Sequence, residues 1–200
     1  MTFHQLFPDI IYQTHVDDSE LIKKKFANKI IHKFKHDPNE QAEWATLSNT
    51  WQVNANQELK DLYWVHFDQH VIKWLQFYNF PPLKYDVDMW INVHTSEMYQ
   101  DYHDHIGHNV ILCGNYNLLL HKKDRSLTFR SPREYTKMLE SFGITITNPL
   151  ASPFSEAVLN IKEGDLVLFA PTQGHQVSLQ NQALQACVFQ GTSWKSFRFH

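Results

Sequence analysis

The sequence predicts an α+β fold, in which a helical N-terminal part packs on an antiparallel β-sandwich or barrel. Before residue 80, apolar residues recur every three or four positions in two segments, which is typical of amphipathic helices. After residue 81, at least seven short strand-like runs alternate with turn signals. The 200 residues, 42% of them hydrophobic, suffice for one sizeable core. We expect a single domain over residues 1–200, with residues 1–80 packing on a barrel built by residues 81–200.

The N-terminal part is predicted to contain one strand and two helices. The strand is LFPDIIYQTHV, whose alternation and proline are typical of a sheet edge. Capping residues of the Asp and Ser type begin the first helix, over 17–34, and a Pro-Pro pair ends the second, over 57–79. Between them we expect a polar loop, 35–56, that carries Trp44 and Trp51. The apolar helix positions are Leu21, Ile22, Phe26, Ile30, Ile31 and Phe34, then Leu59, Leu62, Tyr63, Phe67, Val71, Trp74, Leu75 and Tyr78.

The C-terminal part is predicted to be rich in strands. The segment YDVDMWINV alternates between apolar and polar residues, as a half-buried strand does, whereas NVILCGNYNLLL is apolar enough to be buried on both faces. An insertion at 131–156 contains three prolines and is expected to hold one short helix around 134–142. Turn signals, such as residues 162–165, separate the remaining predicted strands, which are SLTFRSP, AVLNI, DLVLFA, HQVSL and LQACVF.

Composition and charge argue against several classes of protein. The net charge is -3, so the chain lacks the basic field that holds a nucleic-acid backbone. Cys113 and Cys187 both stand in apolar runs, which predicts buried free thiols in a reducing compartment. No signal peptide and no apolar run of membrane-spanning length is present in the sequence. We therefore expect a soluble, cytoplasmic protein without nucleic-acid or membrane partners.

The segment YQDYHDHIGH places three histidines and two aspartates within ten positions, residues 99–108. In a strand, residues i and i+2 point to the same side, so His103 and His105 can present two imidazoles to one point. His175 follows a turn, an apolar strand and a break, which predicts that it begins a new strand whose side chain points into a barrel. Neutral imidazoles suit iron, zinc, copper or nickel, and three of them leave positions open for a substrate or oxygen. These histidines are the candidate metal ligands and the candidate catalytic centre.

Thirteen histidines in 200 residues also give close pairs by chance, so a surface pair that binds nothing is the alternative. The polar neighbours Tyr99 and Asp101 can orient imidazoles through hydrogen bonds, but such residues also occur in ordinary loops. His94 and His108 are close enough in sequence to position the site or to contact a substrate. The other histidines are expected on the surface or on helix faces.

Three segments extend this pattern, and the first and third of them contain the candidate histidines: MWINVHTSEMYQDYHDHIGHNVILCGNYNLLL, FRSPR and IKEGDLVLFAPTQGHQV. Their order resembles the iron(II)/2-oxoglutarate oxygenases of an uncharacterised bacterial and phage group, which are relatives of prolyl and phytanoyl hydroxylases. With the N-terminal LFPDIIYQ and the helices after it, the resemblance covers nearly the whole chain. The matching positions are Trp90 and Asn92, His103 and His105, Cys113, Gly114 and Tyr116, Pro132 and Arg133, Gly164 and Asp165, and His175.

The resemblance implies a double-stranded β-helix, a cupin-like jelly-roll barrel, with iron(II) held by His103, His105 and His175. In the wider superfamily an Asp or Glu stands where this chain has His105. Three neutral ligands leave the ion with a higher net charge, which alters its affinity and redox balance. A bulge in the strand would let Asp101 or Asp104 supply a carboxylate instead. Regular strand geometry turns Asp104 away from His103, so we rank His105 first.

The resemblance also implies 2-oxoglutarate as cosubstrate, and here the chain departs from the pattern. Superfamily members hold the far carboxylate with an Arg or Lys about ten residues after the late histidine, because a guanidinium fits a carboxylate. This chain has Gln185 there, and no cation stands between His175 and Lys195. The candidate cosubstrate ligands are Gln185 itself, Arg130, Arg133, Lys122 and Tyr116, although Arg130 and Arg133 are equally expected as an ordinary surface pair.

We expect an iron(II)- and 2-oxoglutarate-dependent dioxygenase that hydroxylates a small-molecule or peptide substrate. Trp90, Asn92, Tyr99 and Tyr116 are the expected pocket residues, with core packing as their alternative role. A cupin-like barrel that binds a metal or small ligand without turnover is the first rival, and the missing cation supports it. A structural barrel in a phage or cell-surface assembly is the second rival, because such a barrel needs none of the three histidines.

Overall fold

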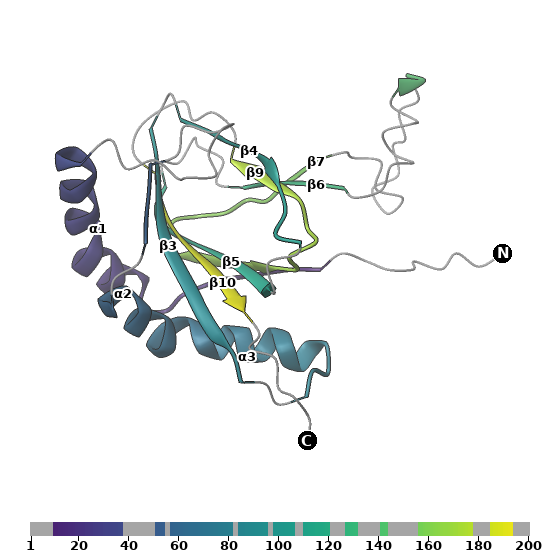
Figure 1. Ribbon diagram of the computed structural model, residues 1–200, viewed down its shortest axis with the longest axis horizontal. Coiled ribbons are helices and arrows are strands. Elements are labelled where there is room, and N and C mark those ends of the chain that lie inside the picture. The colour runs from purple at the N-terminus through teal and green to yellow at the C-terminus, as the bar shows by residue number, and fades with distance from the viewer. Residues whose placement is uncertain are drawn as a thin grey trace.

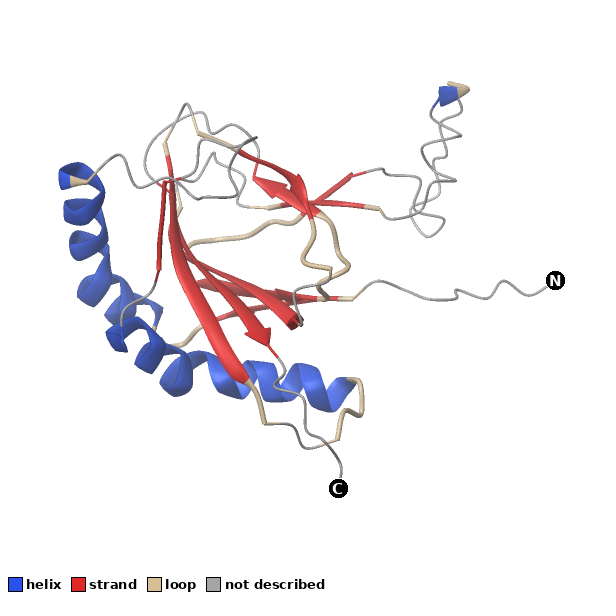
Figure 2. Cartoon of the chain, in the orientation of Figure 1, coloured by secondary structure: helices blue, strands red, loops and turns tan. Residues whose placement is uncertain are grey.

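The computed structural model places a layer of helices against a large β-sheet, with a smaller sheet on the other side of it (Figure 1). Figure 2 shows the helices following one another along the outer side of the large sheet. No helix among the described residues is long and apolar enough to cross a membrane. The structure describes residues 10–37, 51–54, 57–81, 84–95, 98–106, 110–120, 127–131, 141–143, 156–177 and 185–193, with the backbone alone described at 51–54 and 185–193.

Both predicted helices are present. The second contains a π-helical turn, so that it consists of three consecutive helical elements. Most of the predicted apolar positions face the sheet, but Leu21 is 62% exposed and Tyr78 is 40% exposed, so these two do not belong to the buried stripe. The elements are α1 (Ser19–His36), α2 (Gln57–Leu62), the π-helix η1 (Tyr63–Phe67) and α3 (Asp68–Phe77).

The strands form one sheet of six and one of four. The large sheet has the order β1-β8-β5-β10-β3-β2 and the small sheet the order β4-β9-β6-β7, and every pair is antiparallel. The α+β jelly-roll class is therefore confirmed. The strands are β1 (Ile11–His15), β2 (Trp51–Asn54), β3 (Asp86–His94), β4 (Gln100–His103), β5 (Val110–Leu119), β6 (Thr128–Arg130), β7 (Glu156–Val158), β8 (Asp165–Phe169), β9 (His175–Val177) and β10 (Gln185–Ser193).

Two details of the sequence interpretation have different outcomes. The predicted edge position of the first strand is confirmed, because β1 ends the large sheet. The predicted loop was wrong at its end, where β2 pairs with β3 and sets Trp51 opposite Val93. Long-range pairing of this kind leaves little periodicity in a four-residue segment. Most of the expected helix at 134–142 lies outside the described residues, and the division of the chain at residue 80 stays a prediction.

The two faces of the large sheet belong to two different apolar clusters. Side chains alternate across a strand, so Met89, Ile91 and Val93 of β3 pack against the helices. On the opposite face, Val167 and Phe169 of β8 join the cluster between the two sheets. We call the space on that side the barrel interior. The described side chains of β3, β5 and β8 thereby divide between the helix side and the barrel interior.

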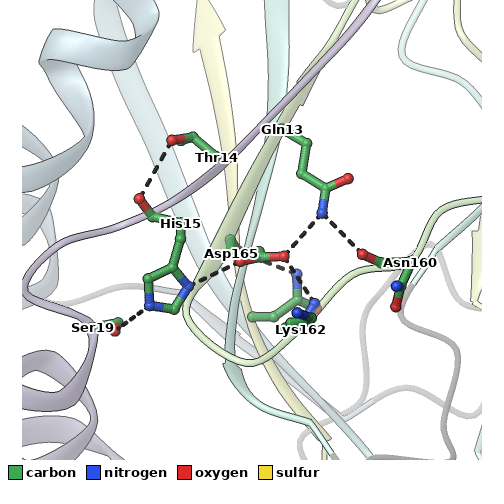
Figure 3. A network of polar contacts seen from close by, with 8 residues as sticks. Gln13, Thr14, His15, Ser19, Asn160, Lys162 and Asp165 are labelled. Carbon is green, nitrogen blue, oxygen red and sulfur yellow. Dashed lines mark hydrogen bonds and ion pairs between the residues drawn. The ribbon is translucent and has the colours of Figure 1, made fainter.

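A polar network joins the N-terminal strand to the start of β8 (Figure 3). Asp165 Oδ1 lies 3.0 Å from His15 Nδ1, and its Oδ2 accepts hydrogen bonds from Gln13 Nε2 and from the Lys162 backbone N–H, each at 2.9 Å. His15 Nε2 lies 3.0 Å from Ser19 Oγ. The order Ser, His, Asp matches that of hydrolase triads, but Ser19 is buried and is not among the residues that line the neighbouring cavity. We therefore assign this network the role of holding β1, α1 and β8 together.

Two glycines with positive φ provide a matched test of packing at the turn before β8, because only Gly164 lies in that turn. Gly164 has φ +84°, and a Cβ there would lie 2.6 Å from the His15 ring and 2.7 Å from Ser19 Cβ. Gly143 has φ +69° and nothing within 4 Å of such a Cβ. We predict that Gly164→Ala lowers the free energy of unfolding by about 3 kcal/mol, through backbone strain plus overlap. Gly143→Ala should lower the free energy of unfolding by only about 1 kcal/mol. If urea unfolding shows equal losses of free energy for the two variants, the packing argument is wrong.

Buried His94 at the end of β3 predicts a pH dependence of stability. Its side chain is fully buried, and burial lowers its pKa from 6.5 to about 4. The unfolded chain therefore takes up this proton at a higher pH than the folded chain, and stability present above pH 6.5 is lost as the pH falls towards 4. The wild type should lose about 3 kcal/mol more over this window than His94→Gln. If the unfolding midpoints of the wild type and of His94→Gln fall equally as the pH falls over this window, the prediction is wrong.

Candidate metal centre

Pairing between two short strands of the small sheet brings the predicted histidines together. His103 of β4 is the direct cross-strand partner of His175 of β9. His105 follows β4 by two residues, and its backbone N–H donates to the Pro171 carbonyl at 2.9 Å, which fixes it beside the segment that leads into β9. Two histidines that are two positions apart and a third one about seventy positions later thus come together in the barrel.

The three imidazoles face one another closely. Each offers one ring nitrogen, and these three nitrogens all lie within 4.8 Å of one another. Ring centroids are 4.2 Å apart for His103 and His175, 5.2 Å for His103 and His105, and 5.3 Å for His105 and His175. Imidazole nitrogens bind transition metals at roughly 2 Å. Small side-chain movements therefore suffice for all three to reach one ion.

Hydrogen bonds set the tautomers of two of these histidines. His103 Nδ1 lies 2.8 Å from the Asp101 carbonyl oxygen, and His175 Nδ1 lies 3.1 Å from the Gln173 carbonyl oxygen. A carbonyl only accepts hydrogen bonds, so each Nδ1 carries the proton and each Nε2 keeps its lone pair. This is the arrangement in which protein histidines bind metals, with the other ring nitrogen held by a carbonyl.

Burial keeps the imidazoles of His103 and His175 neutral. His175 is 0% exposed, and burial together with the neighbouring histidines lowers its pKa well below 6.5. Burial likewise lowers the pKa of His103, against an opposing effect of the hydrogen bond to the Asp101 carbonyl and of the Asp104 charge. Neutral imidazole is the form that coordinates metals. The three residues therefore fit a transition-metal ion in number and distance, and His103 and His175 fit it in protonation state as well.

Aromatic side chains form the wall around the histidine cluster. The Phe169 ring centroid lies 4.7 Å from that of His175, and the Phe129 centroid lies 6.3 Å from it. The Trp90 side chain points from β3 into the barrel interior, and its ring centroid lies 6.5 Å from that of His105. Such rings exclude water and lower the local dielectric, which strengthens electrostatic interactions at the site.

An outer contact supports the strand that carries His175. The Arg130 guanidinium lies 4.7 Å from the Tyr102 ring centroid, and it pairs with Glu156 at 3.4 Å. Gly174 lies so close under the Tyr102 ring that any Cβ there would overlap the phenol. Phe129, next to Arg130, is the cross-strand partner of His175 and shares its face. Arg130 therefore stands on the outer face of β6 and is not brought to the histidines.

The other predicted ligands have different positions. Tyr116 packs on the helix side, with its ring 4.8 Å from that of Phe67, so the structure does not bring it to the histidine cluster. The reason is the alternation of β5, which turns its neighbours Asn115 and Asn117 to the barrel interior instead. Gln185 is the register partner of His94. Arg133, Lys122 and His108 lie outside the described residues.

The two aspartates proposed as alternative ligands are exposed. Asp104 Oδ1 accepts the Ile106 backbone N–H at 3.1 Å, as in a turn, and Asp101 contributes its backbone carbonyl to His103. Neither belongs to the cluster of possible metal ligands found among the described residues. Sequence reasoning missed Asn115, although an asparagine in the middle of a continuously apolar strand was a signal for a polar interior.

Comparison with known structures shows the same fold. A prolyl-4-hydroxylase from Pseudomonas putida superposes with a TM-score of 0.67, at 13% identity and with 94% of each chain covered. HygX from Streptomyces hygroscopicus, with nickel and 2-oxoglutarate bound, gives 0.64 at 10% identity, covering 94% of this chain and 84% of HygX. The viral collagen prolyl hydroxylase of Paramecium bursaria Chlorella virus-1 gives 0.56 at 11% identity, covering 92% and 96%. No curated protein sequence matches the chain.

The sequence itself matches one protein family. The match extends over residues 88–188, which is half of the chain and includes most of β3 and all of β4 to β9, with all three histidines. The family is described as "Putative 2OG-Fe(II) oxygenase", and its cofactors are iron(II) and 2-oxoglutarate. From the barrel, the three converging imidazoles and this match, we conclude that the chain belongs to the 2-oxoglutarate- and iron(II)-dependent oxygenase family.

Proposed function

We propose that this protein is an iron(II)- and 2-oxoglutarate-dependent oxygenase that hydroxylates a small-molecule or peptide substrate, with His103, His105 and His175 as its metal ligands. The observation that carries the proposal is the convergence of three ring nitrogens within 4.8 Å. The Nδ1 hydrogen bonds of His103 and His175 support it, because they leave Nε2 as the coordinating atom.

The all-histidine set has an electrostatic consequence for the cosubstrate. Neutral ligands cancel none of the charge of a divalent ion, whereas the two-histidine, one-carboxylate set cancels part of it. An anionic 2-oxo acid at the open positions then supplies the compensating charge. Three imidazoles should therefore favour binding of an anion before substrate.

The side chains around the histidines have separate roles in this proposal. Iron(II), when bound with 2-oxoglutarate and oxygen, supplies the oxidative decarboxylation and hydroxylation chemistry of the family. The Asp101 and Gln173 carbonyls hold the imidazoles in the coordinating orientation. Phe129 and Phe169 keep water from the His175 side of the site.

A binding barrel without turnover is the second candidate. One observation favours it: no lysine or arginine side chain that the structure describes faces the barrel interior. Those side chains lie on the helices, at exposed positions beside turns, or, for Arg130, on the outer face of β6. Both candidates share the metal site and differ only in whether 2-oxoglutarate is consumed.

Metal binding should depend on the three histidines. We predict that His175→Ala lowers Ni(II) or Fe(II) affinity by more than about 100-fold, because loss of a direct ligand exceeds the 10- to 100-fold effects of outer partners. Metal at one hundred times its Kd should stabilise the wild type by about 2.7 kcal/mol and leave the variant unchanged. His32→Ala, on the exposed face of α1, is the control and should keep full binding. Calorimetric titration checks this, and unchanged affinity in His175→Ala would overturn the ligand assignment.

Turnover should require both cofactors. We predict that the iron-loaded protein converts 2-oxoglutarate to succinate, slowly without substrate, and that His103→Ala abolishes this while His32→Ala does not. Succinate is measured by chromatography under anaerobic and aerated conditions. Metal binding with no succinate in air, across a panel of peptides and small molecules, would favour the binding barrel instead.

A further inference from the structure

Buried carboxamides gather on the strands that surround the histidine cluster. Asn92 of β3 and Asn115 of β5 are each 1% exposed, and Gln100 of β4 is 2% exposed. Among the described residues there is no hydrogen-bond partner for Asn92 Oδ1, Gln100 Oε1 or either polar atom of the Asn115 side chain. Gln100 Nε2 lies 3.4 Å from His103 Nε2, which connects it to the cluster. We call these three residues the amide set.

Sheet register and the Trp90 ring connect the two asparagines to the histidine cluster. Asn115 and Trp90 lie in one cross-strand row, with residue 189 of β10 between them. The Trp90 ring in turn lies 6.5 Å from that of His105. Asn92 follows Trp90 by two residues, so it points to the same side of β3, in the next row of the sheet. Both asparagines therefore flank β10 from its two sides, within the barrel interior.

The interior position of Asn115 follows from its neighbours. Leu112, Tyr116 and Leu118 of β5 belong to the cluster on the helix side, and Cys113 belongs to the cluster between the sheets. Asn115 has the same parity as Cys113, and its cross-strand partner Val167 also lies in the cluster between the sheets. The amide group of Asn115 is thus directed into the barrel.

Unpartnered buried amides are costly, so their clustering requires an explanation. Each buried polar group without a hydrogen bond costs about 1–3 kcal/mol, and folded proteins keep few of them. Asn117, on the same strand and face, shows the usual situation, because its Nδ2 donates to the Asp165 carbonyl at 3.3 Å. A ligand with both donors and acceptors, or with a carboxylate, would satisfy the amide set.

The described part of the barrel interior offers an anion no cation except the metal. Arg130 is used on the outer face by Tyr102 and Glu156. Asp165 lies on the same side of β8 as Val167, and its carboxylate already contacts His15, Gln13 and the Lys162 backbone N–H. The contribution of the amide set itself to ligand recognition is therefore neutral hydrogen bonds.

We propose that Asn92 and Asn115 bind the far end of the 2-oxo acid cosubstrate through their carboxamides, in place of the cation that such a carboxylate usually meets. This inference rests on the proposed function, since it assumes a 2-oxo acid bound at the histidine cluster. Gln100 completes the contact on the side of His103. A carboxamide both donates and accepts hydrogen bonds, so the amide set binds a neutral amide end nearly as well as a carboxylate end.

The proposal makes an unusual specificity prediction. Charged hydrogen bonds are about twice as strong as neutral ones, so a site with a guanidinium discriminates strongly against a neutral ligand end. Here 2-oxoglutarate and its terminal amide, 2-oxoglutaramate, should bind within about tenfold of each other. Both should bind at least tenfold more tightly than 2-oxobutyrate, which lacks the far polar group.

The experiment measures binding to the Ni(II)-loaded full-length protein by calorimetry, so that no turnover is needed. Asn115→Ala and Asn92→Ala should each weaken 2-oxoglutarate binding by about tenfold and leave 2-oxobutyrate unchanged. Asn115→Asp, of nearly equal volume, should weaken 2-oxoglutarate more than 2-oxoglutaramate because like charges repel. Asn28→Ala, on the exposed face of α1, is the control and should change nothing. Circular dichroism and retained Ni(II) affinity identify the variants that are folded.

Two contrary results have different meanings. If the wild type binds 2-oxoglutarate more than 100-fold more tightly than 2-oxoglutaramate, and the folded Asn115→Asp and Asn92→Ala variants match it, a cation holds the carboxylate and the inference is wrong. In that case the proposed function stands. If the wild type binds Ni(II) but none of the three 2-oxo acids, the proposed function fails together with the inference.

Discussion

The cross-strand pair between His103 and His175 is the contact on which the site depends. Strands β4 and β9 are only four and three residues long, and little else in the sequence relates residue 103 to residue 175. Their antiparallel register sets the two side chains on one face, and the hydrogen bond from the His105 N–H to the Pro171 carbonyl adds the third imidazole. A shift of one residue in this register would turn His175 to the outer face.

The large sheet provides the surface against which this pair is held. Its helix side is apolar and continuous, and it takes up the buried residues of all the helical elements. Its other side combines apolar residues such as Phe169 with the buried amides and His94. One β-sheet therefore carries a face packed on the helices and a face turned to the candidate site, because strand alternation separates the two sets of side chains residue by residue.

Sequence reasoning predicted the class of fold and the three histidines that converge, because both rest on local patterns: helical periodicity, strand alternation and the His-x-His spacing. Local patterns do not show where long-range packing directs a side chain. Tyr116 fits a motif, yet the alternation of β5 directs it to Phe67, and Arg130 lies on the outer face because Phe129 pairs with His175. The short strand β2 exists only through its pairing with β3. Buried amides such as Asn115 become visible as a group only when three strands are brought together.

The brace formed by Arg130, Tyr102 and Gly174 crosses β6, β4 and the start of β9 on the side away from the metal site. It supports the histidine-bearing strands from behind without using any coordinating atom. Together with the carbonyls that hold the ring tautomers, it orients the imidazoles through contacts that involve no coordinating atom, so little conformational entropy would be lost on coordination. In small zinc modules, by contrast, the metal itself holds the fold together.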